Sequence, residues 1–181
     1  ETNDLVSESG VVDFVKSLHI PFKVRDYQYY AIYQALKYNR RLLLSPTASG
    51  KSLMIYSITR FFTNRGDNVL IVVPTTSLVE QMCGDFDTYG WSSADNCHKI
   101  YAGKDKNTSK QVTVTTWQSI YKMPKNYFEN FDCVIGDEAH LFKAKSLINI
   151  MTKLHNCKHR IGFTGTLDGS STNQLVLEGL F

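Results

Sequence analysis

The sequence has few cysteines and no long hydrophobic run. Its 181 residues include four cysteines, which form no C-x-x-C pair and no metal-ligand spacing with histidine. This argues against a cysteine metal site and favours a reduced, intracellular protein. Cys133 lies inside an apolar run, where a buried thiol is expected. No stretch approaches the length of a bilayer span, and the first residues contain no signal-peptide core, so no membrane partner is expected.

The bulk composition is that of an ordinary globular domain. Hydrophobic residues make up 43% and charged residues 20% of the chain, and the formal charge of +3 permits an anionic partner without demanding one. The length suits one well-buried domain. The sequence contains no internal repeat, heptad run or low-complexity linker. Because it begins with Glu1 rather than Met, we expect it to be an excerpt of a longer protein.

Short apolar runs alternate with helical patterns along the chain. Runs of three to five residues predict strands at 41–45, 69–73, 99–101, 112–115, 131–135 and 160–163. Apolar residues at spacings of three and four predict helices at 11–18, 27–38, 52–62, 77–86 and 146–155. This alternation predicts an α/β fold with a mostly parallel sheet and helices on both faces.

A phosphate-binding sequence follows the first long helix and strand. Its residues are Ser45, Pro46, Thr47, Ala48, Ser49, Gly50, Lys51 and Ser52. Backbone N–H groups at the start of the next helix can bind phosphate oxygens, and Gly50 lets the chain approach them closely. Lys51 would contact the β- and γ-phosphates, and the Ser52 hydroxyl would coordinate Mg²⁺. Ser45 stands where the strict pattern has glycine, and a chance Gly-Lys-Ser at a helix start is the alternative.

Two carboxylates follow another predicted strand, in the sequence Asp137-Glu138-Ala139-His140. Ligands of open α/β sheets gather at the carboxyl ends of the strands. Asp137 could therefore coordinate Mg²⁺, and Glu138 could take the proton of an attacking water. Taken alone, both acids could simply begin a solvated loop, and His140 could be structural. Together with the phosphate-binding sequence, they make nucleotide hydrolysis the leading hypothesis.

These two motifs and four further stretches resemble, in their order along the chain, the conserved motifs of superfamily 2 helicases. The further stretches are Arg25-Asp26-Tyr27-Gln28, Val73-Pro74-Thr75-Thr76-Ser77-Leu78, Thr115-Thr116-Trp117-Gln118-Ser119 and Phe163-Thr164-Gly165-Thr166-Leu167. They resemble the adenine-recognition element and motifs Ia, Ib and III, while the acidic sequence has the DEAH form of motif II. The likeness extends from Phe22 to Phe181, and within the superfamily it is greatest to phage recombination helicases.

The resemblance implies a fold, an activity and partners. The fold would be a RecA-like P-loop NTPase domain at residues 25–181, preceded by a helical lead-in at residues 1–24. The activity would be that of an ATP-dependent DNA helicase or translocase that remodels branched DNA in recombination or repair. ATP and Mg²⁺ would be the cofactors, and DNA and a second RecA-like domain, absent from this sequence, would be the partners. The location would be the cytoplasm of a bacterial or phage-infected cell.

The resemblance also implies a role for each matching residue. Glu138, Lys51 and Asp137 would be catalytic, with Ser52 and Asp137 holding the metal. Nucleotide-binding residues would be Arg25, Gln28, Pro46, Thr47, Ala48, Ser49, Gly50, Lys51 and Ser52. Nucleic-acid backbone contacts would come from Pro74, Thr75, Thr76, Thr115 and Thr116. The residues that couple the two sites would be His140, Thr164, Gly165 and Thr166.

Several alternatives stay open at the level of sequence. Gln28 could be a surface residue of an amphipathic helix, and the threonines at strand ends could cap helices or turns. For Trp117, core packing is favoured over base stacking. The motifs fit an RNA-dependent ATPase as well as a DNA translocase, because backbone contacts do not reveal the sugar. A nucleotide-binding module without turnover is a further alternative.

Overall fold

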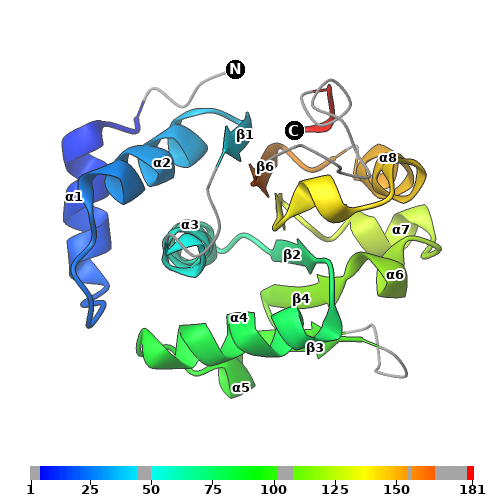
Figure 1. The fold of residues 1–181 in the computed structure, drawn as a ribbon, viewed down its shortest axis with the longest axis horizontal. Helices are drawn as coiled ribbons and strands as arrows, with labels where there is room; N and C mark the ends of the chain where they lie inside the picture. The colour runs from blue at the N-terminus through cyan, green and yellow to red at the C-terminus, as the bar shows by residue number, and fades with distance from the viewer. Residues whose placement is uncertain (1–4, 45–49, 102–107, 155, 166–178) are drawn as a thin grey trace.

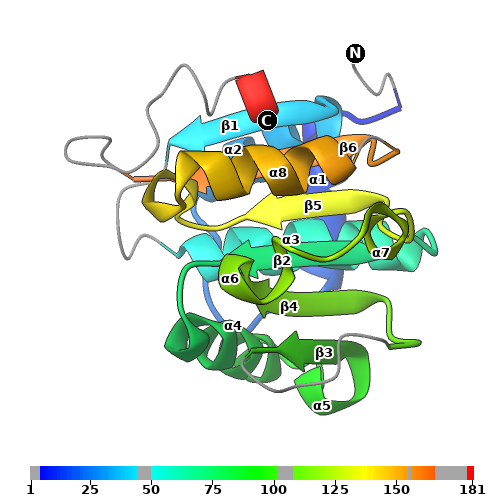
Figure 2. The same ribbon diagram turned by 90° about the vertical axis from the view of Figure 1, so that its right-hand side faces the viewer.

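A six-stranded sheet forms the centre of the computed structural model, which describes residues 5–44, 50–101, 108–154, 156–165 and 179–181. Every pair of neighbouring strands is parallel. Figure 2 shows their order from top to bottom, β1-β6-β5-β2-β4-β3. The strands are β1 (Arg40–Leu44), β2 (Val69–Val73), β3 (Cys97–Ile100), β4 (Val112–Thr116), β5 (Cys133–Gly136) and β6 (His159–Thr164). The predicted parallel α/β architecture is confirmed.

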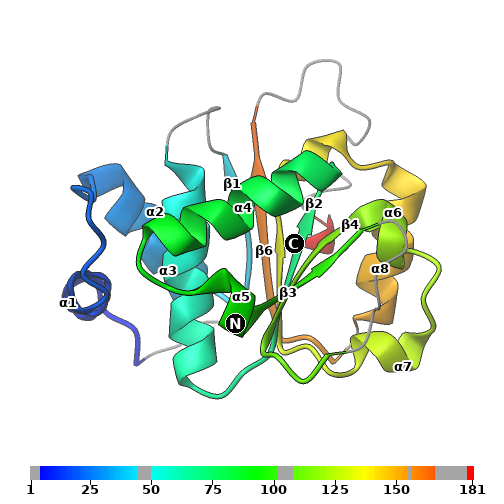
Figure 3. The same cartoon turned by 90° about the horizontal axis from the view of Figure 1, so that it is seen from below.

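Helices cover both faces of this sheet. Figures 1 and 3 show α1, α2, α3 and α4 on one face and α6, α7 and α8 on the other. The helices are α1 (Glu8–Ser17), α2 (Asp26–Lys37), α3 (Lys51–Asn64), α4 (Thr76–Thr88), α5 (Ser93–Asn96), α6 (Trp117–Ile120), α7 (Lys125–Phe128) and α8 (Ala144–Lys153), with a 3-10 turn η1 (Ala139–Leu141). Helix α5 contacts α4 and the edge strand β3.

Strand β2 illustrates why the sheet forms where it does. All five of its residues are buried, as expected for a continuous apolar run in a parallel sheet with both faces covered. Because side chains alternate along a strand, Val69, Ile71 and Val73 join the cluster beneath α1 to α4. Leu70 and Val72 join the second cluster, beneath α6 to α8. The fold therefore has two apolar layers, one on each side of the sheet.

The structure differs from the predicted elements mainly in its short ones. The sequence pattern did not predict α5, α6, α7 or η1, because three or four residues are too few to show a helical period. The strand predicted at 131–135 begins at Cys133, since the Phe131 N–H donates to the Phe128 carbonyl in a turn. The weak strand predicted at 99–101 begins two residues earlier, at Cys97.

The predicted lead-in at residues 1–24 includes α1. Its residues Val11 and Val15 are buried in the same apolar cluster as α2 and α3. The boundary between residues 24 and 25 stays a prediction. All four cysteines are buried and free, as expected for Cys133. Within the described ranges, no helix combines the length and apolar character that crossing a membrane requires.

A pair of glycines makes a notch in the face of the sheet. Gly136 on β5 and Gly162 on β6 are register partners, and the ring of Phe181 lies against both. A Cβ at either glycine would lie 2.9 Å from an atom of that ring. Phe181 is only 6% exposed, so the notch is filled. Gly136 directly precedes Asp137, which places this packing next to the predicted site.

Candidate functional site

The predicted site residues that the structure describes meet at one edge of the sheet. Asp137 and Thr164 lie at the carboxyl ends of β5 and β6, and the Asp137 N–H donates to the Val72 carbonyl of neighbouring β2. Helix α3 begins at Lys51, after β1 and the phosphate-binding sequence. This is the edge at which parallel α/β sheets bind ligands. Pro46, Thr47, Ala48, Ser49 and Thr166 lie outside the described residues.

Gly50 opens the helix that would bind phosphate. It is the N-cap of α3 and has φ 73°, a left-handed conformation that glycine adopts without strain. A Cβ there would collide with the Gln28 side chain. The 14-residue helix directs its free N–H groups and its positive dipole end towards the site. The local geometry is therefore suited to an anion.

Gln28 is buried rather than exposed, which excludes the surface alternative. Only 4% of its surface is accessible. Its Nε2 donates to the Gly50 carbonyl at 3.3 Å, and its Oε1 accepts from the Arg25 N–H at 2.9 Å. Gln28 thus joins the start of α2 to the start of α3. Arg25, the N-cap of α2, is exposed beside it.

Lys51 lies between the two predicted catalytic carboxylates. Its Nζ is 3.0 Å from Asp137 Oδ1 and forms a close ion pair with Glu138 Oε1. Burial opposes the positive charge, but the attraction of both acids outweighs it and raises the pKa of Lys51. Burial also raises the pKa of Asp137, and the nearby ammonium reduces that shift. The described part of the site is therefore a compact cluster of one cation and two anions.

Glu138 has a special backbone conformation. Its φ of 52° places it in the left-handed region, which glutamate rarely adopts. The residue sits between β5 and η1, so the chain turns sharply directly after the strand. Strained backbone of this kind is typical of functional sites. Here it directs Glu138 towards Lys51 and brings Glu138 Oε2 to within 3.6 Å of His140 Nε2.

Ser52 and Asp137 have the chemistry to hold Mg²⁺, which prefers oxygen ligands and commonly binds through one or two protein oxygens together with phosphates. Asp137 is only 3% exposed, and its Oδ1 has no well-aligned hydrogen bond despite the nearby Lys51. The Ser52 hydroxyl lies 2.6 Å from that of Tyr89. Among the described residues, no group of three or more His, Cys, Asp or Glu side chains is placed to hold a metal ion.

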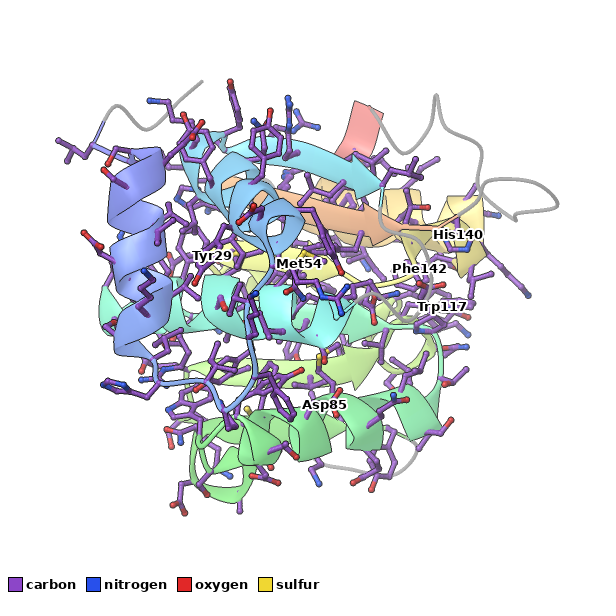
Figure 4. All side chains as sticks on the ribbon, turned by 60° about the vertical axis from the view of Figure 1, so that its left-hand side comes forward. Tyr29, Met54, Asp85, Trp117, His140 and Phe142 are labelled. Atoms are coloured by element: carbon purple, nitrogen blue, oxygen red, sulfur yellow. The ribbon has the colours of Figure 1, made fainter. Side chains whose placement is uncertain are left out.

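His140 connects the acidic motif to the end of β6. Its Nδ1 lies 2.9 Å from the Thr164 hydroxyl and accepts a hydrogen bond of 3.2 Å from the Gly165 N–H. All three residues are buried. The structure thus brings together three of the four residues predicted to couple the two sites. Figure 4 shows His140 on the same side of the molecule as Trp117 and Phe142.

A groove lies beside this edge, where β2 and β4 end. Its volume is about 450 Å³, and it is lined by Pro74, Thr75, Thr76, Thr116, Gln118 and Ser119. Thr75 caps α4 by accepting from the Leu78 N–H, as one alternative for the threonines proposed. The Thr116 and Ser119 hydroxyls are 2.7 Å apart, and Gln118 Nε2 donates to the Pro74 carbonyl. Four of the five residues predicted to contact nucleic acid line this groove.

Thr115 is the exception. It is fully buried, and its hydroxyl donates to the Thr116 carbonyl at 3.0 Å. Thr115 lies on the face of β4 opposite Val114 and does not line the groove, and its contact with nucleic acid stays a prediction. Trp117 is also buried, with its ring centroid 6.4 Å from that of Phe142, so core packing is the correct interpretation.

Gln118, Ser119 and Tyr89 also belong to this region, although the sequence patterns predict no role for them. Gln118 and Ser119 line the groove, and their place in the motif Ib stretch could have suggested it. Tyr89, which contacts Ser52, lies 37 residues away in sequence and carries no motif signal. Only the crossing of α4 and α3 brings it there.

Comparison with known proteins identifies the family. A family model described as "Type III restriction enzyme, res subunit" (ResIII) matches residues 21–169. The chain belongs to the ResIII family. The "ATP-dependent DNA helicase uvsW" of Enterobacteria phage T4 is 36% identical over 160 residues, which cover 86% of this chain and 32% of that protein. The "DNA 3'-5' translocase XPB2" of Sulfurisphaera tokodaii is 30% identical over 168 residues, or 88% of this chain and 35% of that protein.

Solved structures agree with this membership. The crystal structure of T4 UvsW matches all of this chain and 38% of its own chain, with a TM-score of 0.91 and 31% identity. The Pyrococcus furiosus Hef helicase domain matches 86% of this chain and 35% of its own, with a TM-score of 0.68 and 20% identity, a likeness of fold alone. The fold is that of the first RecA-like domain of superfamily 2 helicases. The chain spans about a third of the length of the curated relatives it matches.

Proposed function

We propose that this ResIII domain binds ATP and forms half of an ATPase site, and that ATP hydrolysis at this site drives movement on DNA. The observation that carries the proposal is the convergence of Lys51, Asp137 and Glu138 at the first turn of α3. A helix N-terminus and a lysine suit a polyphosphate, and a carboxylate pair suits a metal and an attacking water. The names of the two curated relatives, a DNA helicase and a DNA translocase, support the same activity.

In this proposal Lys51 changes partners when nucleotide binds. Its ammonium moves from the carboxylates to the β- and γ-phosphates, which frees Glu138 to face a water. The oxygen of that water then attacks the γ-phosphorus while Glu138 accepts the proton of the water. The bond between the γ-phosphorus and the bridging oxygen breaks, and ADP carries away the electron pair. Mg²⁺, held by Ser52 and Asp137 together with the nucleotide, would neutralise charge on the phosphates.

Gln28 and Arg25 would bind the base end of the nucleotide. Gln28 is buried and already anchored to the Gly50 carbonyl, so its amide is held beside the phosphate-binding helix. Replacing Gln28 with Ala should weaken ATP binding and reduce the difference in affinity between ATP and GTP, because an amide that recognises the base edge would be lost. Equal loss of affinity for both nucleotides would contradict this role.

The groove beside the site would bind the sugar–phosphate backbone of DNA. It presents the hydroxyls of Thr75, Thr76, Thr116 and Ser119, which can contact phosphates without reading the base sequence. His140, Thr164, Gly165 and Thr166 would transmit the state of the γ-phosphate to this groove. A second RecA-like domain would complete the ATP site with arginines, and branched DNA in recombination or repair would be the substrate. We place this work in the cytoplasm of a phage-infected or bacterial cell.

The decisive variant is Glu138→Gln, made in a protein that carries this domain together with its second motor domain. We expect ATP turnover to fall by at least about a hundredfold, because a general base is lost, while ATP binding remains. Undiminished turnover would refute the catalytic assignment. The absence of turnover in the unmodified protein would instead favour a binding module. Comparing single-stranded, duplex and branched DNA with RNA as activators would distinguish a DNA motor from an RNA-dependent ATPase.

A further inference from the structure

Tyr89 contacts the predicted metal ligand Ser52 from a distant part of the chain. It is the C-cap of α4, and its hydroxyl oxygen lies 2.6 Å from that of Ser52, a short and strong hydrogen-bond distance. Tyr89 is 8% exposed. Burial raises the pKa of the Tyr89 phenol, so it remains a neutral hydroxyl across the physiological range. Tyr89 itself belongs to none of the helicase-like motifs.

The ring of Tyr89 is held firmly by its neighbours. Its centroid is 5.1 Å from that of Tyr56, one turn along α3 from Ser52, and 6.0 Å from that of Phe22, which meets it edge to face. Both α3 and α4 are regular helices of more than ten residues. The Tyr89 hydroxyl therefore has a fixed position. Through its hydrogen bond it can fix the rotamer of Ser52, a small and partly exposed side chain.

A serine hydroxyl can bind a tyrosine and a metal at the same time. It has one proton and two lone pairs, so a hydrogen bond with the Tyr89 hydroxyl leaves at least one lone pair for a cation. A serine side chain has three χ1 rotamers, and the hydrogen bond with Tyr89 holds Ser52 Oγ in one of them. Restricting that choice before binding lowers the entropic cost of coordination.

We propose that Tyr89 is a positioning residue for Ser52 and thereby sets the Mg²⁺ requirement of nucleotide binding. This inference rests on the proposed ATP site. Tyr89 would be a further residue of that site, and its role depends on its contact with Ser52 and on the packing of the Tyr89 ring. Because Tyr89 ends the helix that Thr75 caps at the groove, the same helix has one end at the groove and the other at Ser52.

The test measures the Mg²⁺ dependence of binding of a fluorescent ATP analogue to the chain of residues 1–181. Four proteins are compared with the unmodified chain: Tyr89→Phe, Ser52→Ala, the double variant, and Tyr56→Phe. Tyr56→Phe is the matched control, because it removes a buried hydroxyl from the same aromatic cluster, where the Tyr56 hydroxyl accepts from Arg60 rather than contacting Ser52. Analogue affinity in EDTA and circular dichroism check that each variant is folded.

We expect Tyr89→Phe to raise the Mg²⁺ concentration for half-maximal binding about three- to tenfold, the change that loss of one hydrogen bond produces. Affinity in EDTA should not change. Tyr56→Phe should leave the Mg²⁺ requirement unaltered, and Tyr89→Phe should add nothing in the Ser52→Ala background. An unchanged Mg²⁺ requirement in Tyr89→Phe would overturn the role of Tyr89, as would a shift in that requirement that persists in the Ser52→Ala background. Neither result would bear on the proposed ATP site. If the unmodified chain showed no Mg²⁺-dependent binding, the proposed ATP site would fall together with the role of Tyr89.

Discussion

The imidazole of His140 is fixed by Thr164, whose hydroxyl lies 2.9 Å from Nδ1. The Gly165 N–H also points at Nδ1, at 3.2 Å, and an amide N–H can only donate. Nδ1 must therefore be an acceptor, which places the proton of the neutral ring on Nε2. That nitrogen lies 3.6 Å from Glu138 Oε2. The end of β6 thus determines which side of the imidazole faces the predicted catalytic base.

This geometry predicts the tautomer of His140. Long-range ¹H–¹⁵N correlation spectra at pH 8 should show Nε2 protonated and Nδ1 bare. Thr164→Val removes one of the two partners of Nδ1 and should lower the unfolding free energy by about 1 kcal/mol, because a buried hydrogen bond is lost. A spectrum with Nδ1 protonated would contradict the hydrogen-bond assignment, since the Gly165 N–H would then face another donor.

Lys51→Met should destabilise the domain in a pH-dependent way. The variant leaves Asp137 and Glu138 close together without their cation, and we expect a loss of roughly 1–3 kcal/mol at pH 8, moderated by partial solvent access. Removing the ammonium raises the pKa of Asp137 further, so protonation relieves the folded state as pH falls. Urea unfolding should therefore show a smaller loss at pH 4.5 than at pH 8.

A neutralising second substitution is the control for the Lys51 prediction. Asp137→Asn in the Lys51→Met background removes one uncompensated anion and should restore part of the lost stability at pH 8. If the double variant were as unstable as the sum of the two single variants, repulsion between the carboxylates would not be the cause.

His159 should make the domain sensitive to acid. Burial, together with the charges of Arg65 and Lys158, lowers the pKa of His159 to about 4 from 6.5. The unfolded chain therefore binds the proton first, so stability is complete above pH 6.5 and is lost as pH falls from 6.5 towards 4. His159→Gln should flatten the unfolding free energy over that window in urea titrations. His19→Asn, at an exposed turn, should keep the slope; a slope equally lost in both variants would point to a general effect of histidine number.

The notch formed by Gly136 and Gly162 should not tolerate a methyl group. Gly162→Ala would place Cβ 2.9 Å from the Phe181 ring and 3.0 Å from Leu42, and should cost about 1–3 kcal/mol in urea unfolding. Gly179→Ala is the matched control, because among the described residues no atom other than those of its chain neighbours lies within 4 Å of its would-be Cβ. In a Phe181→Ala background the penalty of Gly162→Ala should shrink. A penalty that stays the same there would show that Leu42 or the backbone, rather than Phe181, limits the space.

The sequence predicted the strands and longer helices because each has enough residues to display a period. Strand β2 is a five-residue apolar run, and it was located to the residue. Helices α6 and α7 are too short for this, although they cover one end of the sheet. The strand ends are informative for another reason. In a parallel sheet Asp137 and Thr164 lie at the same edge, and the pairing of β5 with β6 makes them neighbours.

Contacts between distant segments could not be predicted in this way. No local pattern shows that Tyr89 reaches Ser52 or that Phe181 fills a notch between β5 and β6. The burial of Thr115 follows from the coverage of both faces of the sheet, since all five residues of β4 are buried. The likeness to helicase motifs favours a role for Thr115, which stays a prediction.

The position of Lys51 between two acids has a consequence for how the site fills. The ammonium acts as an internal counter-ion, so the resting domain does not expose two unbalanced negative charges to an incoming polyphosphate. Under the proposed function, a nucleotide that arrives with its metal would exchange one cation for another. The Lys51 ammonium would move to the phosphates, and Ser52 and Asp137 would hold a divalent ion that balances the carboxylate charge. A nucleotide without a metal would draw Lys51 away from Asp137 and Glu138 without supplying another cation to balance their charges. The domain should therefore discriminate between the two forms before any chemistry begins.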